Sequence, residues 1–162
     1  MSSGDTLCTF LPYQNEPPSS NYATFSLRNG HPILQFNDTT AYSAIFTGLI
    51  PQNYSNTTGV TVYVTGAAAA TAGTMGWTVE FERMDAATDV DSDSFASAQT
   101  ITATTVPGTS GGPLILNVAV AKGANMDLIV AGDTFRLRVK RDVASDTAVG
   151  NTELLSVEIR ET

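Results

Sequence analysis

The residues that most resemble a chemical site in the 162-residue chain are four aspartates near its middle: Asp85, Asp89, Asp91 and Asp93. The run from Asp89 to Asp93 puts carboxylates at alternate positions, as in the first three ligands of a calcium-binding loop. The glycine and the final glutamate of such loops are missing, because Ser94 and Thr100 stand there. These departures favour a solvated loop, so we expect no metal ligand and no cofactor.

Two glutamates, Glu80 and Glu82, alternate along one predicted strand. Paired carboxylates can hydrolyse a glycosidic bond when both face a cleft. A second predicted strand carries Arg136 and Arg138 at the same spacing. Opposite charges on neighbouring strands attract by about 0.2–1 kcal/mol per pair. We therefore expect a structural ion-pair face on the outside of a sheet, with Glu80 and Glu82 opposite Arg136 or Arg138.

Nucleophilic catalysis has little support in the sequence. The chain has one histidine, His31, which lies in a turn between Gly30 and Pro32, and one cysteine, Cys8. The run Gly108-Thr109-Ser110-Gly111-Gly112 has the letters of the G-x-S-x-G motif of serine hydrolases. That motif needs a strand before it and a helix after it, whereas this run lies between two predicted strands with no helix following. No catalytic residue is assigned, and the chain is expected not to be an enzyme.

The elements that must position any site are strands. Apolar and polar residues alternate with a period of two in five segments and more weakly in four others. The clear segments are 60–65, 77–82, 114–121, 135–140 and 155–160, and the weaker ones are 24–27, 33–36, 43–49 and 100–104. Short helical turns are expected at 93–98 and 124–129, and a loop at 67–70. The pattern predicts an all-β, two-sheet antiparallel sandwich of jelly-roll type, with an immunoglobulin-type sandwich as the alternative.

Residues 1–20 differ from the predicted sandwich domain at 21–162. The pair Pro17-Pro18 enforces an extended backbone, so we predict an extended N-terminal arm. Large apolar side chains are costly to leave in water, and an arm carrying them could dock on a neighbouring subunit. The candidate interface residues, which include one tyrosine from a later loop, are Leu7, Phe10, Leu11, Tyr13 and Tyr54. A frayed terminus, or side chains that fold back on their own domain, is the alternative.

Net charge and hydropathy exclude two classes of binding partner. The formal net charge is −8, and such a chain repels nucleic acid phosphates. The uncharged stretches are rich in Thr, Ser, Gly and Ala, so they do not read as membrane spans. Neither nucleic acid nor membrane is expected as a partner.

The chain resembles small jelly-roll virion proteins of tailed bacteriophages over nearly its whole length. The segments that carry the resemblance are TFLPYQNEPP at 9–18, ATFSLRNGHP at 23–32, LQFNDTT at 34–40, VEFERM at 79–84, VDSDSFASA at 90–98, FRLRVKRD at 135–142 and EIRET at 158–162. The resemblance implies a capsid decoration, or cement, protein that binds the major capsid protein as a homotrimer on the head surface. It also implies assembly in the bacterial cytoplasm, and it transfers no catalytic residue or cofactor.

Two alternatives to the decoration role are a tail or fibre accessory protein and a carbohydrate-binding β-sandwich module. A carbohydrate-binding module needs exposed aromatic rings on a concave face. Trp77 alternates into the apolar face of its strand, which makes it a poor sugar platform. The tyrosines Tyr42, Tyr54 and Tyr63 are the candidates that the sequence leaves for this role.

Overall fold

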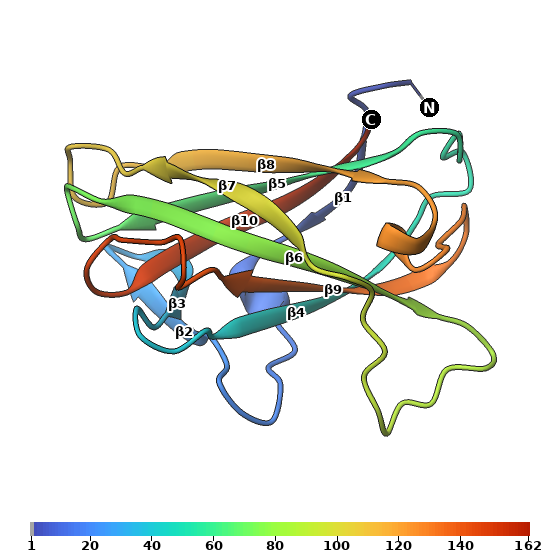
Figure 1. Ribbon diagram of the computed structural model, residues 1–162, viewed down its shortest axis with the longest axis horizontal. Coiled ribbons are helices and arrows are strands. Elements are labelled where there is room, and N and C mark those ends of the chain that lie inside the picture. Colours follow the sequence, from blue (N-terminus) through green and yellow to red (C-terminus); the bar gives the residue numbers. More distant parts are fainter. Residues whose placement is uncertain (1) are drawn as a thin grey trace.

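The structure is a computed structural model that describes residues 2–162. It contains ten strands and two short 3-10 turns, η1 and η2 (Figure 1). The strands are β1 (Thr6–Phe10), β2 (Thr24–Arg28), β3 (His31–Phe36), β4 (Ser43–Leu49), β5 (Gly59–Ala68), β6 (Thr74–Met84), β7 (Gln99–Thr105), β8 (Leu114–Ala121), β9 (Thr134–Arg141) and β10 (Thr152–Glu161). The turns are η1 (Pro12–Gln14) and η2 (Ala124–Met126).

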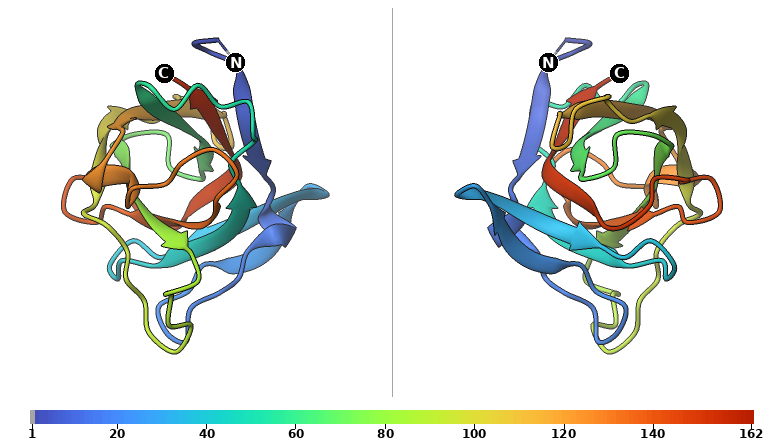
Figure 2. Two further views of the ribbon diagram at one scale, coloured as in Figure 1. Left: turned by 90° about the vertical axis from the view of Figure 1, so that its right-hand side faces the viewer. Right: turned by 90° about the vertical axis from the view of Figure 1, so that its left-hand side faces the viewer.

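The strands form two sheets in which neighbouring strands are antiparallel. The larger sheet has the order β2-β3-β10-β5-β8, with β1 also paired to β10, and the smaller sheet has the order β4-β9-β6-β7. Figure 2 shows the two sheets curving around a common interior. The fold is a two-sheet antiparallel β-sandwich of the jelly-roll type, as the alternating pattern predicts.

The core lies between the sheets because each strand turns its apolar side chains inward. The valines of β5, Val60, Val62 and Val64, are fully buried, and the alternate residues of that strand are partly exposed. Trp77 of β6 meets Phe36 of β3 edge to face, with 4.7 Å between ring centroids. Contacts of this kind join one sheet to the other and bury the large aromatic side chains.

The prediction of an extended N-terminal arm is corrected by the pairing of β1. Within residues 2–20, β1 pairs with β10 from Thr6 opposite Arg160 to Phe10 opposite Val157. Leu7 and Phe10 belong to the core, and the Phe10 ring stacks on Phe46 at 5.3 Å. The segment folds onto its own domain because this burial removes apolar surface from water. Met1 lies outside the described residues.

The predicted loop and helical turns are only partly present in the structure. Ala67 and Ala68 belong to β5, so the loop that the sequence predicts at 67–70 is wrong for these two residues. No helical turn forms at 93–98, whereas η2 lies inside the turn expected at 124–129. Within residues 2–162 no helix is long and apolar enough to cross a membrane.

The β2–β3 hairpin lies at one edge of the larger sheet, where Figure 2 shows it projecting to the side of the sandwich. Its turn holds Asn29 at φ 47° and Gly30 at φ 81°. Two successive positive φ values are what a type I′ turn requires, and Asn-Gly is its preferred sequence. In the register set by this turn, Phe25 lies opposite Leu34. Leu34 is fully buried, so the face that carries Phe25 continues the interior surface of the sheet.

Candidate functional site

An apolar groove of about 380 Å³ lies between the β2–β3 hairpin and the segment that precedes it. We refer to it as the aromatic groove. Its volume falls within the range of about 300–1,000 Å³ that is common for ligand pockets. Its lining residues are Pro12, Tyr13, Asn15, Pro17, Tyr22, Ala23, Thr24, Phe25 and Leu34.

Three aromatic side chains around this groove are open to solvent. The exposed fractions are 66% for Tyr13, 48% for Tyr22 and 51% for Phe25. Other large aromatic side chains of the chain, such as Trp77 and Phe81, are fully buried. A cluster of exposed rings in one groove is typical of a surface that contacts a partner or ligand.

Each ring is held by a different element. Tyr13 lies in η1, whose first residue is Pro12, and proline favours the start of a helical turn. The Leu11 backbone N–H donates to the side chain of Gln14 at 2.8 Å, which closes this turn. Tyr22 forms an isolated parallel bridge with Ser43, and Phe25 lies within β2. The backbone of all three residues is therefore fixed by hydrogen-bonded structure.

The aromatic groove also presents polar groups that are free to bind. The side-chain oxygen of Asn15 accepts a hydrogen bond from the Ile45 N–H at 3.0 Å, which orients the amide. The NH2 group of Asn15 and the hydroxyls of Tyr13, Tyr22 and Thr24 have no hydrogen-bond partner within residues 2–162. The groove therefore combines ring faces with unengaged hydrogen-bonding groups at its margin.

The predicted interface residues do not lie together on the surface. Leu7, Phe10 and Tyr54 are buried in the chain's own core, and Leu11 is half-buried. Tyr54 is only 4% exposed, because its loop packs against the end of the sandwich. Of the five, Tyr13 alone is well exposed, and it lies in the aromatic groove.

The tyrosines suggested as sugar contacts are also unsuited to that role. Tyr42 packs against the core, and Tyr54 is buried. Tyr63 is half-buried, and the Arg160 guanidinium covers its ring at 4.3 Å from the centroid. The sequence does not single out Tyr22 and Phe25. The alternation at 24–27 is typical of a strand whose apolar side chains are buried, so it predicts a buried Phe25. The signal that could have found them is the proximity of Tyr22, Phe25 and Leu27 to the proline-rich segment at 12–18.

The structure places Glu80 opposite Arg138 and Glu82 opposite Arg136 across the β6–β9 ladder. The Glu82 carboxylate lies 2.6 Å from the Arg136 guanidinium, and Glu80 and Arg138 form a second ion pair. This is the pairing that the alternating charges predict. The expectation of a solvated outer face is wrong, however, because Glu82 is fully buried and Glu80 is 8% exposed.

A segment that follows β6 covers these ion pairs. The ring of Phe95 lies 4.1 Å from the Arg138 guanidinium and 5.2 Å from that of Arg136. The Asp93 carboxylate adds an ion pair to Arg136 at 2.9 Å. Because the three carboxylates are paired with the two guanidinium groups, these residues hold the covering segment on the sheet and are not free to act as a general acid and base.

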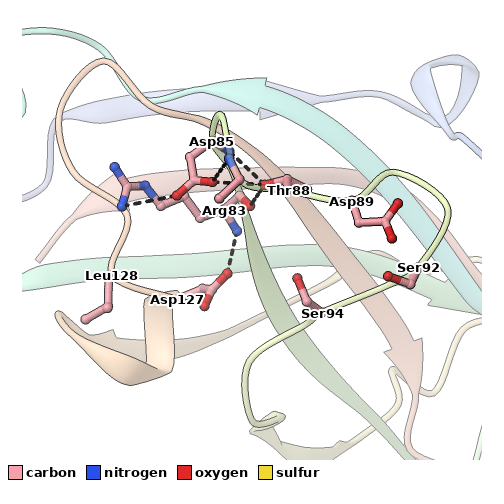
Figure 3. A pocket seen from close by; sticks show the side chains of 9 residues that line it. Arg83, Asp85, Thr88, Asp89, Ser92, Ser94, Asp127 and Leu128 are labelled. Atoms are coloured by element: carbon pink, nitrogen blue, oxygen red, sulfur yellow. Dashed lines mark hydrogen bonds and ion pairs between the residues drawn. The ribbon is translucent and has the colours of Figure 1, made fainter.

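The acidic segment lines a polar pocket (Figure 3). The guanidinium of Arg83 lies there, 3.8 Å from Asp85 and 2.7 Å from Asp133. Asp89 accepts a hydrogen bond from the Asp91 N–H at 3.0 Å, which is a local turn contact. Within residues 2–162 no group of three or more His, Cys, Asp or Glu side chains is placed to share a metal ion. The aspartates are therefore dispersed among arginines and turns.

A third pocket, of about 220 Å³, brings Ser110, His31 and Glu153 together. These residue types suggest nucleophilic catalysis, but their contacts do not support it. Arg28 donates to both carboxylate oxygens of Glu153, at 2.8 and 2.9 Å, and to the Ser110 hydroxyl oxygen at 2.9 Å. The His31 ring has no hydrogen bond within residues 2–162. A nucleophile–base–acid chain needs Ser-to-His and His-to-carboxylate contacts, and Arg28 occupies both ends here.

Comparisons with known proteins bear on the fold. Neither protein-family models nor curated proteins give a match to the sequence. Similar solved structures include PfGH50B, which is 13% identical with a TM-score of 0.52; the match covers 98% of this chain and 24% of PfGH50B. A CBM35 from Cellvibrio japonicus Abf62 is 9% identical over 98% of this chain and 86% of its own, with a TM-score of 0.49. The C-terminal CBM6 of LamC, a marine laminarinase from Zobellia galactanivorans, is 14% identical over 96% of this chain and 92% of its own, with a TM-score of 0.41.

The likeness is one of fold. At these identities a shared β-sandwich does not transfer a ligand or an activity. The chain spans only 24% of PfGH50B, so the properties of that whole protein do not transfer to this chain. The comparisons do not bear on the resemblance to phage virion proteins, and the capsid decoration role stays a prediction.

Proposed function

We propose that this protein is a non-catalytic carbohydrate-binding module and that the aromatic groove binds the glycan. The observation that carries the proposal is the grouping of Tyr13, Tyr22 and Phe25, each about half exposed or more, around one groove. Sugar rings present C–H groups on their faces and hydroxyls at their edges. An aromatic platform with free amide and hydroxyl groups beside it matches both features.

The energetics favour a ligand of this kind. Each exposed ring keeps apolar surface in water, and covering that surface gains about 25 cal/mol per Å². Contact with an aromatic face adds to that gain. The unengaged hydroxyls of Tyr13 and Tyr22 would otherwise be desolvated without a partner, which disfavours a purely apolar occupant. A glycan supplies acceptors and donors for them.

The absence of catalysis is part of the proposal. None of the residues that line the aromatic groove carries a carboxylate, an imidazole or an amine. Hydrolysis of a glycosidic bond by the usual route needs two carboxyl groups beside the sugar. Glu80 and Glu82, the pair that the spacing suggests, are buried under the Phe95 segment and paired with arginines. These contacts favour a binding role.

The test is affinity gel electrophoresis against a panel of soluble polysaccharides, followed by calorimetry on those that retard the protein. Tyr13→Ala and Phe25→Ala should each weaken binding by about tenfold, which corresponds to 1.4 kcal/mol. The matched control is Ile115→Ala on β8, a side chain that is 64% exposed at the opposite edge of the same sheet. If no polysaccharide binds, or if the groove variants bind as the control does, the proposal is overturned.

A second candidate is a virion structural protein, as a capsid decoration protein or a tail or fibre accessory. One observation favours it beside the sequence resemblance. Leu27 is 60% exposed on β2, next to Phe25, and β2 is an edge strand whose outer backbone groups are unpaired. Such an edge can pair with another chain. Light scattering should then give the mass of a trimer, and Leu27→Lys should dissociate it; a monomer that binds glycan would favour the first proposal.

A further inference from the structure

The aromatic groove has no ionic group in its lining. The residues around it are proline, tyrosine, asparagine, alanine, threonine, phenylalanine and leucine. The adjacent acid, Glu16, accepts a hydrogen bond from the Thr47 hydroxyl at 2.9 Å and lines a different pocket. The nearby base, Arg28, is paired with Glu153. Glu16 therefore keeps its negative charge, Arg28 is neutralised by Glu153, and the groove offers no unpaired cation to an anionic ligand.

A charged ligand would therefore lose hydration in the groove without gaining a counter-ion. Burying an unpaired charge is far more costly than burying a hydrogen-bonded neutral group. The chain as a whole has a formal net charge of −8, so an anionic polymer is also repelled at longer range. A neutral polymer experiences neither effect.

We infer that the aromatic groove selects uncharged polysaccharides and rejects uronate-bearing and sulfated ones. This inference rests on the proposed function and names its ligand class. The ring faces supply the contact with the sugar, and the Asn15 amide and the free hydroxyls supply hydrogen bonds that do not depend on ionic strength. Binding should therefore be insensitive to salt, because neither partner contributes a charge to the contact.

The experiment uses polysaccharide pairs that share a backbone and differ in charge. The pairs are hydroxyethyl- and carboxymethylcellulose, methyl-esterified and de-esterified homogalacturonan, and agarose and chemically sulfated agarose. For whichever backbone binds, the neutral member should bind about tenfold or more tightly than the charged one. Its affinity should stay within about twofold when salt rises from about 0.05 to 0.5 M, a range over which ionic contacts weaken strongly.

A charge-gain variant gives an independent readout. Thr24 lines the aromatic groove and is exposed, so Thr24→Lys places an ammonium beside the rings without disturbing the core. This variant should bind the charged member of the pair at low salt and lose that binding at high salt. Thr104→Lys on β7, also at an exposed threonine, is the matched control and should not gain it.

The outcomes separate the two proposals. Preference for the charged polysaccharide, or a strong salt dependence in the unmodified protein, overturns the inference while leaving carbohydrate binding in place. Failure of every polysaccharide to bind, or binding that Tyr13→Ala and Phe25→Ala leave unchanged, overturns the proposed function and the inference with it. Salt-independent preference for the neutral member, weakened by both groove variants, supports both.

Discussion

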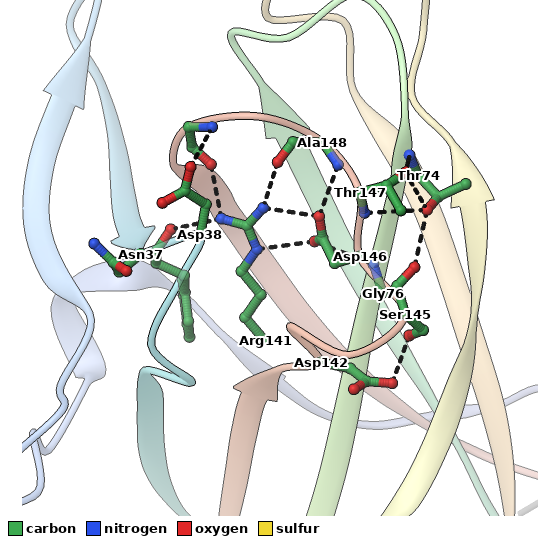
Figure 4. Close-up of polar contacts among 12 residues, drawn as sticks. Asn37, Asp38, Thr74, Gly76, Arg141, Asp142, Ser145, Asp146, Thr147 and Ala148 are labelled. Carbon is green, nitrogen blue, oxygen red and sulfur yellow. Dashed lines mark hydrogen bonds and ion pairs between the residues drawn. The ribbon is translucent and has the colours of Figure 1, made fainter.

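Arg141 and Asp146 form a bidentate ion pair that is almost fully withdrawn from solvent, with the two side chains 1% and 0% exposed. The guanidinium donates to the two Asp146 oxygens at 2.9 and 2.7 Å. Its remaining N–H groups donate to the backbone carbonyls of Phe36, Ala148 and Gly150 (Figure 4). All five N–H donors of an arginine are thereby used. The pair ties the loop between β9 and β10 to the end of β3.

Removing one charge of this pair should destabilise the protein severely. Asp146→Asn keeps the shape of the side chain but leaves the Arg141 charge buried without a counter-ion, which costs about 3–5 kcal/mol. Urea unfolding followed by circular dichroism measures the loss. The control, Glu158→Gln, removes a carboxylate from the more exposed pair with Arg160 and should leave the midpoint nearly unchanged. Equal midpoints for the two variants would contradict this reading.

Phe95→Ala should loosen the acidic segment without unfolding the sandwich. The ring contacts both the Arg136 and Arg138 guanidinium groups, and such contacts are worth about 0.5–2 kcal/mol each. The expected result is faster amide exchange at 85–98, above all at Ser94, whose N–H donates to Glu82. Val90→Ala, at a position in the same segment that is 80% exposed, is the control. Unchanged protection in the Phe95 variant would show that the ring does not hold the segment.

The single tryptophan, Trp77, reports on the core and not on the aromatic groove. It is fully buried against Phe36, so its emission should be blue-shifted and resistant to acrylamide until the protein unfolds. Trp77→Phe should fold with modest loss, whereas Trp77→Ala should lose about 3–5 kcal/mol. Saturating glycan should leave this emission unchanged. Emission typical of a solvated indole in the native protein would contradict the packing.

Cys8 should contribute to a decrease in stability at alkaline pH. Burial raises the pKa of its thiol from 9.0 to about 11. Between these pH values the unfolded chain has lost the proton while the folded chain keeps it, so the free energy of unfolding falls as pH rises. Below about pH 9 the thiol contributes no slope.

The Cys8→Ser variant isolates this contribution, because Tyr54, whose pKa burial also raises, is unchanged. Urea unfolding between about pH 8 and pH 11 should give a shallower decline for the variant than for the unmodified protein. The folded thiol should also react slowly with a disulfide reagent at neutral pH and quickly in urea. Identical pH slopes would show that the thiol is not protected in the folded state.

The regular strands could be predicted from the sequence, but β1 could not. The valines of β5 and the charged rows of β6 and β9 alternate cleanly, so the inward faces of these strands follow from the period of two. The pairing of β6 with β9 follows from their opposite charges. In β1 a shift in register between Thr6 and Cys8 leaves the buried residues Leu7 and Phe10 three positions apart. A three-residue spacing of buried side chains does not show the period of two by which a strand is recognised in a sequence.

The candidate site depends on contacts between segments that are distant in the sequence. The period-two pattern describes one strand at a time and does not predict such contacts. Tyr13, Tyr22 and Phe25 come from three separate elements and meet only because the β2–β3 hairpin lies beside η1. The burial of Glu82 depends in the same way on the segment that carries Phe95. The pairing of charges could be predicted, whereas their removal from solvent could not.

The most direct test of the account is calorimetric titration of one neutral polysaccharide into the unmodified protein and into the Tyr13→Ala/Phe25→Ala double variant. The variant's fold is verified beforehand by the Trp77 emission. Glycan binding in the aromatic groove predicts measurable binding to the unmodified protein and a loss of about a hundredfold or more in the double variant, which corresponds to about 2.7 kcal/mol. Equal affinity for the two proteins, or no binding to either across the polysaccharide panel, would contradict it.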